Sequence, residues 1–317
     1  MKNYRYLFGP VPSRRFGRSL GVDLTPLKTC SLNCVFCQLG RTPRTTLDRR
    51  EYVPTDQVLA ELQDWLASGQ SADYISLAGS GEPTLHRDFG TVLQYLREHS
   101  DIPSALLTNG TLLHLPEVRQ AAAQADVVKA SLSAWNQASF GWINRPHPTL
   151  RFADLLSGLQ SFRSEFKGQL WLEVFLVGGM NAIPADLRKI AALAATIAPD
   201  RIQLNTAVRP PAEDFAMPLS RKQLEDLSLL FEPRAEVIAE FDGSADKKFE
   251  INLESIHAML LRRPCTAAQI AQTFGLHDNE VAKYLGRLVR DARVQPETRG
   301  AEVYYRASEA GSSHARP

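Results

Sequence analysis

The sequence predicts an α/β fold, a partial (β/α)6 TIM-like barrel followed by a small C-terminal winged-helix domain. Two observations lead to this prediction. From about residue 19 to 240, short β-branched or apolar runs alternate with longer segments of helical periodicity, the pattern of repeated βα units around a parallel sheet. After residue 241 the pattern changes to helical segments and a hairpin. We therefore place a barrel domain at residues 1–242 and a second domain at residues 250–308.

Six strands are expected in the barrel, at residues 19–24, 73–79, 104–109, 126–133, 170–177 and 201–208. Helices are expected between or after them, at residues 54–68, 87–99, 116–124, 149–166, 184–198 and 219–231. Several of these helices are introduced by Pro, Thr or Ser, which are frequent at helix N-termini. Six βα units predict an incomplete barrel that is open on one side.

The C-terminal region reads as a winged helix-turn-helix. Helical patterns cover residues 251–263, 266–275 and 277–292, and a hairpin with its turn at Arg299–Gly300 follows. Helix, short helix, turn, helix and β-wing in that order define this motif. Its third helix carries a basic stripe, but acidic residues occupy the N-terminal end where base edges are normally read. Contact with RNA, a peptide, DNA or the barrel itself therefore all stay open.

Composition indicates a soluble cytoplasmic protein without a membrane segment. The 317 residues are 44% hydrophobic and 22% charged, and no apolar run reaches the roughly 18 residues that a membrane span needs. The N-terminus also lacks the apolar stretch of a secretory signal. Residues 1–50 carry ten Lys or Arg against two Asp. This basic region can support a thiolate cluster or receive an anionic substrate.

Three of the four cysteines form a C-x3-C-x2-C motif at Cys30, Cys34 and Cys37, just after the first expected strand. Three thiolates can hold three corners of a [4Fe–4S] cluster and leave the fourth iron without a protein ligand. Zinc is the alternative, but a structural zinc site needs a fourth ligand, and the nearest histidine is His86. The motif therefore favours an iron–sulfur cluster with one open iron.

This motif resembles that of the radical S-adenosylmethionine superfamily. The resemblance implies two cofactors, a [4Fe–4S] cluster and S-adenosylmethionine, whose methionyl amine and carboxylate chelate the open iron. It also implies that Phe36, directly before the last cysteine, lies against the adenine edge. Reductive cleavage would then give a 5′-deoxyadenosyl radical for hydrogen abstraction, with electrons from a flavodoxin- or ferredoxin-type donor.

Further matches lie where the carboxyl ends of parallel strands build an active site. The second strand is followed by Gly79, Gly81, Glu82 and Pro83, which resembles the superfamily's glycine-glycine-glutamate-proline motif for the methionyl amine. A turn that merely opens a helix is the alternative. The third strand ends in Thr108 and Asn109, as in many relatives.

Strand alternation supplies the other expected cofactor contacts. Lys129, Ser131 and Ser133 share one face of the fourth strand. By resemblance, the serines bind the ribose. Lys129 is a candidate partner for the methionyl carboxylate, and a solvated lysine is the alternative. Gln203 and Asn205 share a face of the sixth strand, and we assign them to the cofactor or the substrate because buried polar groups need partners.

Residues 5–240, with their preamble Phe8–Arg15, resemble a group of radical enzymes catalogued with the wyosine-base synthases of tRNA. The archaeal wyosine enzymes carry a second set of cluster cysteines, whereas the only other cysteine here is Cys265, which we expect to be a buried structural thiol. An oxidoreductase- or transferase-type enzyme of tRNA modification is expected. A peptide-modifying enzyme and an iron–sulfur redox sensor that binds DNA are the alternatives. The sequence identifies neither the catalytic acid or base nor the oligomeric state.

Overall fold

The barrel is built on one eight-stranded sheet. The computed structural model describes residues 4–238, 253–274, 276–300 and 302–308. The strands are β1 (Leu7–Ser13), β2 (Gly17–Val22), β3 (Tyr74–Leu77), β4 (Ser104–Leu107), β5 (Val127–Ser131), β6 (Gln169–Leu176), β7 (Arg201–Thr206) and β8 (Glu236–Val237). They lie in sequence order, with β1 antiparallel to β2 and every later pair parallel. The predicted α/β partial barrel is confirmed.

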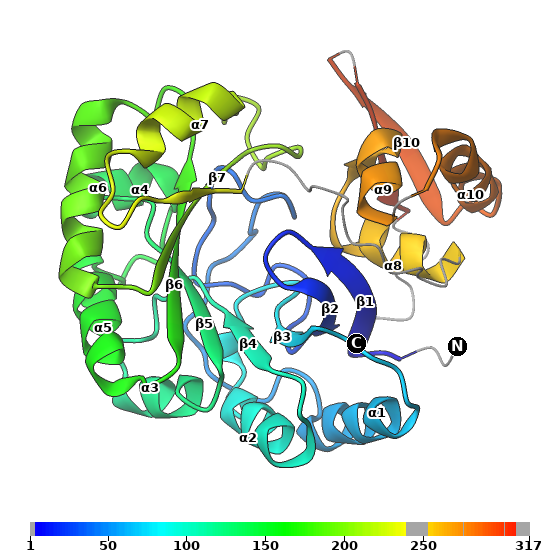
Figure 1. Cartoon of the computed structure of the whole chain (residues 1–317), viewed down its shortest axis with the longest axis horizontal. Helices are drawn as coiled ribbons and strands as arrows, with labels where there is room; N and C mark the ends of the chain where they lie inside the picture. The colour runs from blue at the N-terminus through cyan, green and yellow to red at the C-terminus, as the bar shows by residue number, and fades with distance from the viewer. Residues whose placement is uncertain (1–3, 239–252, 275, 301, 309–317) are drawn as a thin grey trace.

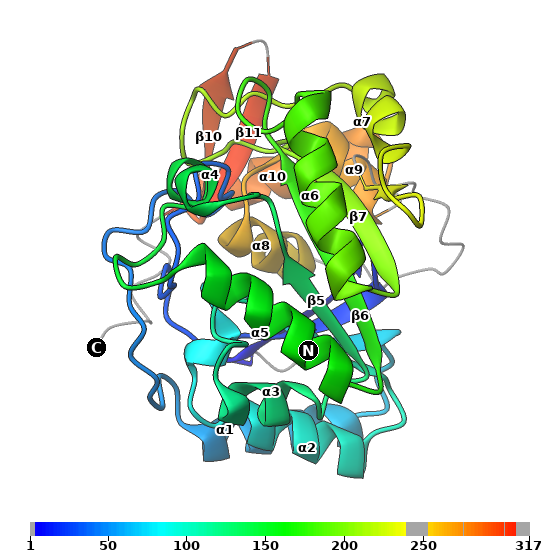
Figure 2. The ribbon, with the colours of Figure 1, turned by 90° about the vertical axis from the view of Figure 1, so that its left-hand side faces the viewer.

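Helices cover the outside of this curved sheet (Figure 1). They are α1 (Thr55–Ala67), α2 (Phe89–His99), α3 (Pro116–Ala122), α4 (Gln137–Ile143), α5 (Phe152–Glu165), α6 (Pro184–Ile197) and α7 (Arg221–Ser228), with a 3-10 turn η1 at Pro83–Leu85. The view from the side shows α1, α2, α3, α5 and α6 as one outer layer (Figure 2). The two edge strands, β1 and β8, do not pair with each other among the described residues, so the sheet stays open between them.

The structure contains all six predicted barrel strands and all six predicted helices, with ends that differ by a few residues, and among the described barrel residues it adds β1, α4, β8 and the short turn η1. Strand β1 contains Pro10 and Pro12, and a proline is tolerated mainly at a sheet edge, where β1 lies. Helix α4 has seven residues and a capping box between Asn136 and Ser139, so it is too short to show a periodic pattern. Strand β8 has two residues.

The C-terminal residues form a second unit with its own hydrophobic core. Its elements are α8 (Leu253–Arg262), β9 (Cys265–Thr266), α9 (Ala267–Phe274), α10 (Asp278–Arg290), β10 (Val294–Arg299) and β11 (Glu302–Ala307). Cys265 is 1% exposed within that core. The expected domain boundary near residues 242–250 lies outside the described residues. Across the described chain, no helix combines the length and apolar character that crossing a bilayer requires.

The second unit lies beside the open edge of the barrel (Figure 1). Helix α8 packs against β1, and Gln269 Nε2 of α9 donates a hydrogen bond to the Val208 carbonyl oxygen, just after β7, at 3.1 Å. The C-terminal unit therefore contacts both sides of the opening that six βα units leave.

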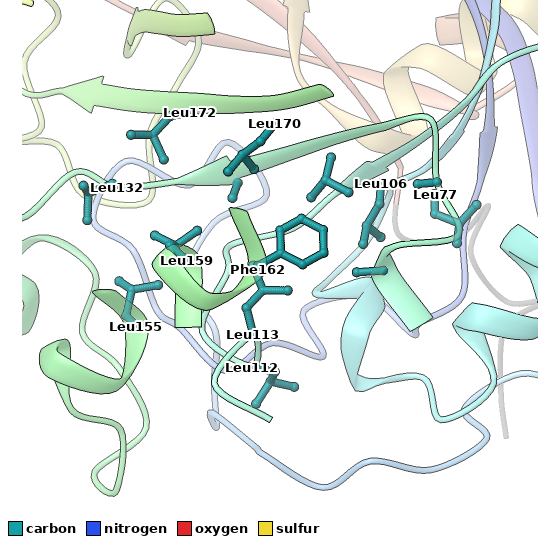
Figure 3. Packing of buried hydrophobic residues seen from close by; sticks show 14 of the residues in the cluster. Leu77, Leu106, Leu112, Leu113, Leu132, Leu155, Leu159, Phe162, Leu170 and Leu172 are labelled. Carbon is teal, nitrogen blue, oxygen red and sulfur yellow. The ribbon is translucent and has the colours of Figure 1, made fainter. Parts of the chain in front are cut away.

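The main core lies between the sheet and its helices. Figure 3 shows part of it, in which Leu159 and Phe162 of α5 lie alongside strands that carry Leu106, Leu170 and Leu172. On β5, Val128 and Ala130 belong to this core, whereas Lys129 faces the barrel lumen. This separation is the strand alternation that the sequence predicts.

Replacing Phe162 with alanine tests this packing. Phe162 is fully buried, so the change should lower the free energy of unfolding of the barrel by about 3–5 kcal/mol. Denaturant unfolding followed by circular dichroism measures the loss. The matched control is Leu229→Ala, because Leu229 is 63% exposed. Equal unfolding midpoints for Phe162→Ala and the unmodified protein would contradict the assigned core.

Candidate functional site

Each sulfur of the cysteine motif receives a hydrogen bond from a different part of the chain. The three pairs are Lys28 Nζ to Cys37 Sγ at 3.1 Å, Asn144 Nδ2 to Cys34 Sγ at 3.3 Å, and Asn109 Nδ2 to Cys30 Sγ at 3.6 Å. Lys28 lies on the cysteine loop itself, Asn109 follows β4, and Asn144 follows α4. Such donors stabilise negatively charged sulfur.

The protein surroundings disfavour free thiolates at two of these positions. Burial raises the pKa of Cys30 to about 12, and it also raises the pKa of Cys34. A bound metal reverses this effect because its positive charge removes the thiol proton. Three cysteines with three sulfur-directed donors therefore fit the iron–sulfur cluster that the motif predicts.

A single metal ion is a different case. Among the described residues, no group of three or more His, Cys, Asp or Glu side chains is arranged to hold one. In a cubane cluster each cysteine binds a different iron, so the three sulfurs do not surround one ion. The result therefore concerns sites for a single metal ion.

Backbone contacts fix the cysteine loop to the end of β3. Lys28 N donates to the Ser80 carbonyl oxygen at 2.7 Å, and Glu82 N donates to the Thr29 carbonyl oxygen at 2.9 Å. A Cβ atom at Gly81 would overlap that Thr29 oxygen. The glycine therefore allows the backbone that follows β3 to approach the residue next to Cys30.

The Glu82 carboxylate ties the ends of β3 and β4 together. It accepts hydrogen bonds from Thr108 Oγ1 at 2.6 Å and Asn109 N at 2.7 Å, and from both the backbone N and the Oγ1 of Thr84. It is 2% exposed, and burial raises its pKa although these hydrogen bonds oppose the shift. Glu82 thus positions Asn109, which in turn reaches Cys30.

A charged network fills the barrel lumen around Glu173. Its carboxylate accepts hydrogen bonds from Lys129 Nζ at 2.8 Å, from Asn205 Nδ2 at 2.9 Å and from Arg15. Arg15 also donates to Gln203 Oε1 at 2.9 Å. Burial alone would raise the pKa of Glu173, but the charges of Arg15 and Lys129 hold it well below its usual range. The side chain therefore stays ionised in the lumen.

A cavity of about 390 Å³ opens beside this network. Of the predicted site residues, it is lined by Phe36, Cys37, Gly79, Gly81, Lys129 and Asn205. The Phe36 ring stacks on Phe175, with centroids 4.0 Å apart. The cysteine motif and the glycine turn thus meet at one cavity, as strands that end at a common edge require.

Nine other predicted residues do not line this cavity. Two of them are the cysteines Cys30 and Cys34, and the cofactor contacts of the other seven stay predictions. These seven are Glu82, Pro83, Thr108, Asn109, Ser131, Ser133 and Gln203. Pro83 begins η1, and Ser133 Oγ accepts a hydrogen bond from the backbone N of Phe175 at 3.0 Å. Their described contacts are with the protein, so they fix the strand ends against one another.

The cavity also exposes residues that sequence reasoning did not select. Phe175, Arg209, Met259 and Arg263 line it, and the last two come from the C-terminal unit. No sequence motif marks them, because they meet only when the unit packs on the barrel. Asn144 is also absent from the predicted set. The sequence feature that could have indicated it is a polar side chain at the end of a helix.

Gly81→Ala tests the loop anchor. The new methyl group overlaps the Thr29 carbonyl oxygen, and an overpacked contact of this kind costs about 1–3 kcal/mol. We expect less iron per chain after anaerobic cluster assembly, measured by metal analysis. Gly141→Ala is the control, because a Cβ atom there meets open space. Equal iron in both variants would contradict the anchoring role.

Comparison with protein families places these features in a known group. The model of the radical SAM superfamily matches residues 24–194, more than half of the chain. A UPF0026 protein of Helicobacter pylori (strain J99) is 30% identical over 310 residues, which cover 96% of this chain and 98% of that protein. A protein named GTPase Obg of Brachyspira hyodysenteriae is 37% identical over 295 residues. The match covers 92% of this chain but 43% of that protein.

Solved structures show the same fold. A radical SAM methyltransferase from Sphaerobacter thermophilus superposes with a TM-score of 0.52 at 19% identity, over 70% of this chain and 67% of that one. The protein anSMEcpe, with bound AdoMet and the Cp18Cys peptide, gives a TM-score of 0.51 at 15% identity, over 69% of this chain and 62% of that one. The family match, the fold and the cysteine cavity agree, and the chain belongs to the radical SAM superfamily.

Proposed function

We propose that this protein is a radical enzyme that uses a [4Fe–4S] cluster on Cys30, Cys34 and Cys37 together with S-adenosylmethionine. The observation that carries the proposal is the single cavity in which the cysteine loop, the glycine turn after β3 and the charged lumen meet. When bound, the cluster and S-adenosylmethionine supply a 5′-deoxyadenosyl radical that abstracts hydrogen from a substrate. An external flavodoxin- or ferredoxin-type donor supplies the electron.

The chain's own residues bind and orient these groups. Gly79 and Gly81 line the cavity and let the turn after β3 pack closely on Asp23 and Thr29, and Phe36 offers an aromatic face beside Cys37. Lys129 already pairs with Glu173, so contact with the methionyl carboxylate requires Lys129 to exchange partners. Asn205 is the polar side chain of β7 that reaches the same cavity.

Seven further residues are proposed as cofactor ligands or as their supports. Thr108, Asn109 and Glu82 hold the ends of β3 and β4, and Pro83 directs the chain into η1. Ser131 and Ser133 are proposed for the ribose, and Gln203 for the cofactor or the substrate. The close hydrogen bonds among the first three support a positioning role.

We also propose that the C-terminal unit is a winged helix that presents the substrate to the barrel, and that the substrate is RNA. The order of its helices and hairpin supports the first point. Met259 and Arg263 of this unit line the cavity, which supports its contact with a substrate, and the positive charge of Arg263 favours a substrate with phosphate groups, such as RNA. Two alternatives to an RNA-modifying enzyme are an enzyme that acts on a peptide and a regulator whose cluster controls DNA binding.

Cys34→Ala tests the radical enzyme directly. Anaerobic protein with dithionite and S-adenosylmethionine should release 5′-deoxyadenosine, and loss of one cluster ligand should abolish the release. Chromatography of the quenched reaction measures the product. Cys265→Ala is the control, because Cys265 lies in the C-terminal core. Full release by Cys34→Ala would overturn the ligand assignment, and no release by the unmodified protein would favour the regulator.

Lys28→Met tests the charge beside the cluster. The Lys28 ammonium lies 3.1 Å from Cys37 Sγ and favours the reduced cluster, which carries one more negative charge. Removing it should lower the reduction potential by tens of millivolts, because about 59 mV corresponds to a tenfold change for one electron. A redox titration followed by electron paramagnetic resonance measures the shift. Lys167→Met, at an exposed lysine, should leave the potential unchanged.

A further inference from the structure

The cavity beside the cysteine loop has a marked excess of positive charge. Five basic residues line it, namely Arg14, Arg15, Lys129, Arg209 and Arg263, against the single acidic residue Glu173 among the described residues. Both Arg15 and Lys129 form ion pairs with Glu173. The charges of Arg14, Arg209 and Arg263 therefore have no further counterion in the described cavity wall.

These three arginines come from three separate parts of the fold. Arg14 lies in the turn between β1 and β2, Arg209 follows β7, and Arg263 follows α8. Their cavity is therefore bounded by the barrel on one side and by the C-terminal unit on the other. Packing of α8 on β1 brings the third arginine to the first two.

The hydrogen bonds of these arginines are few and go to neutral acceptors. Arg14 donates to the Ile238 carbonyl oxygen at 3.0 Å and Asn205 Oδ1 at 3.3 Å, and Arg209 donates to Gln38 Oε1 at 3.0 Å. Arg263 contacts Met259 Sδ at 3.4 Å. Within the described part of the chain, no carboxylate lies within ion-pair distance of any of the three. Most of their guanidinium N–H groups thus stay available.

Burying the positive charges of these arginines without a bound anion is energetically unfavourable. Burial, together with the positive charges of neighbouring arginines that include Arg263, lowers the pKa of Arg209 to about 9 and that of Arg14 to about 10. In addition, the buried Nε of Arg209 has no hydrogen-bond acceptor in the described chain. Buried donors and charges of this kind normally have partners. A bound anion would satisfy them.

We propose that Arg14, Arg209 and Arg263 form a subsite for a phosphate group of the substrate. Three guanidinium groups exceed what one carboxylate can neutralise, whereas a phosphate offers up to two negative charges and several acceptor oxygens to planar N–H forks. The subsite deepens the proposed function, on which it rests, because it opens into the cavity that Cys37 and Gly79 line. The phosphate belongs either to a free nucleotide or to an RNA backbone.

Inorganic pyrophosphate is the probe for this subsite. Calorimetric titration into anaerobically assembled protein, with saturating S-adenosylmethionine, should show binding that weakens as salt is added. The double variant Arg209→Gln with Arg263→Gln should bind pyrophosphate roughly tenfold more weakly or worse, because charge-assisted hydrogen bonds are lost. The control is Arg97→Gln with Arg188→Gln, two exposed arginines of the barrel helices outside the cavity, which should bind as the unmodified protein does.

Iron content and circular dichroism establish that each variant is folded. The single Arg263→Lys variant keeps the charge but loses the planar fork, so it should bind pyrophosphate more weakly than the unmodified protein and more tightly than Arg263→Gln. Equal pyrophosphate affinity in the cavity variant and the unmodified protein would overturn the proposal. Binding that disappears when S-adenosylmethionine is present would also overturn it, because the arginines would then hold the methionyl carboxylate.

The source of the phosphate follows from two further titrations. Cytidine 5′-monophosphate that binds as tightly as a short RNA identifies a nucleotide, whereas tighter binding of the RNA identifies its backbone. Release of 5′-deoxyadenosine from the same preparation separates the two proposals. Release without pyrophosphate binding refutes the subsite alone, and binding without release refutes the proposed function alone.

Discussion

The site depends on the close backbone approach between the cysteine loop and the end of β3. Two hydrogen bonds join them, from Lys28 N to the Ser80 carbonyl oxygen and from Glu82 N to the Thr29 carbonyl oxygen. The approach needs Gly81 because any side chain there would overlap Thr29. It places Cys30 beside the next strand end, where Glu82 holds Asn109 and Asn109 reaches the sulfur. A few hydrogen bonds to residues that follow β3 and β4 thus fix a loop that has no regular secondary structure.

The second constraint is electrostatic. Glu173 forms ion pairs with Arg15 and Lys129 in the lumen, so one carboxylate offsets part of the positive charge where the strands pack. Further out, where α8 covers the opening, arginines meet without carboxylates from the described residues. This division separates a hydrogen-bonded region in the lumen, where one carboxylate offsets part of the positive charge, from a positive region at the opening, where we propose that the substrate binds. In a partial barrel, the unclosed side is where a substrate can enter without displacing the core.

Much of this arrangement follows from the sequence, and the exceptions have physical causes. The spacing of Cys30, Cys34 and Cys37 and the glycine turn after β3 are local patterns, so the order of the residues is enough to predict the cluster site. Strand alternation likewise predicts that Lys129 faces the lumen. Glu82 shows the limit of this reasoning, because a motif gives the residue type but not its partners, which are Thr84, Thr108 and Asn109. Arg209 and Arg263 were beyond prediction because they meet only through packing of the C-terminal unit on the barrel.

The central claim is that one iron of the cluster has no protein ligand and is free to bind S-adenosylmethionine. Electron paramagnetic resonance of the anaerobically reduced protein tests it most directly. The account predicts the signal of a [4Fe–4S] cluster whose g values change when S-adenosylmethionine is added. A cluster signal that the addition leaves unaltered, or a preparation that binds zinc in place of iron, would contradict it.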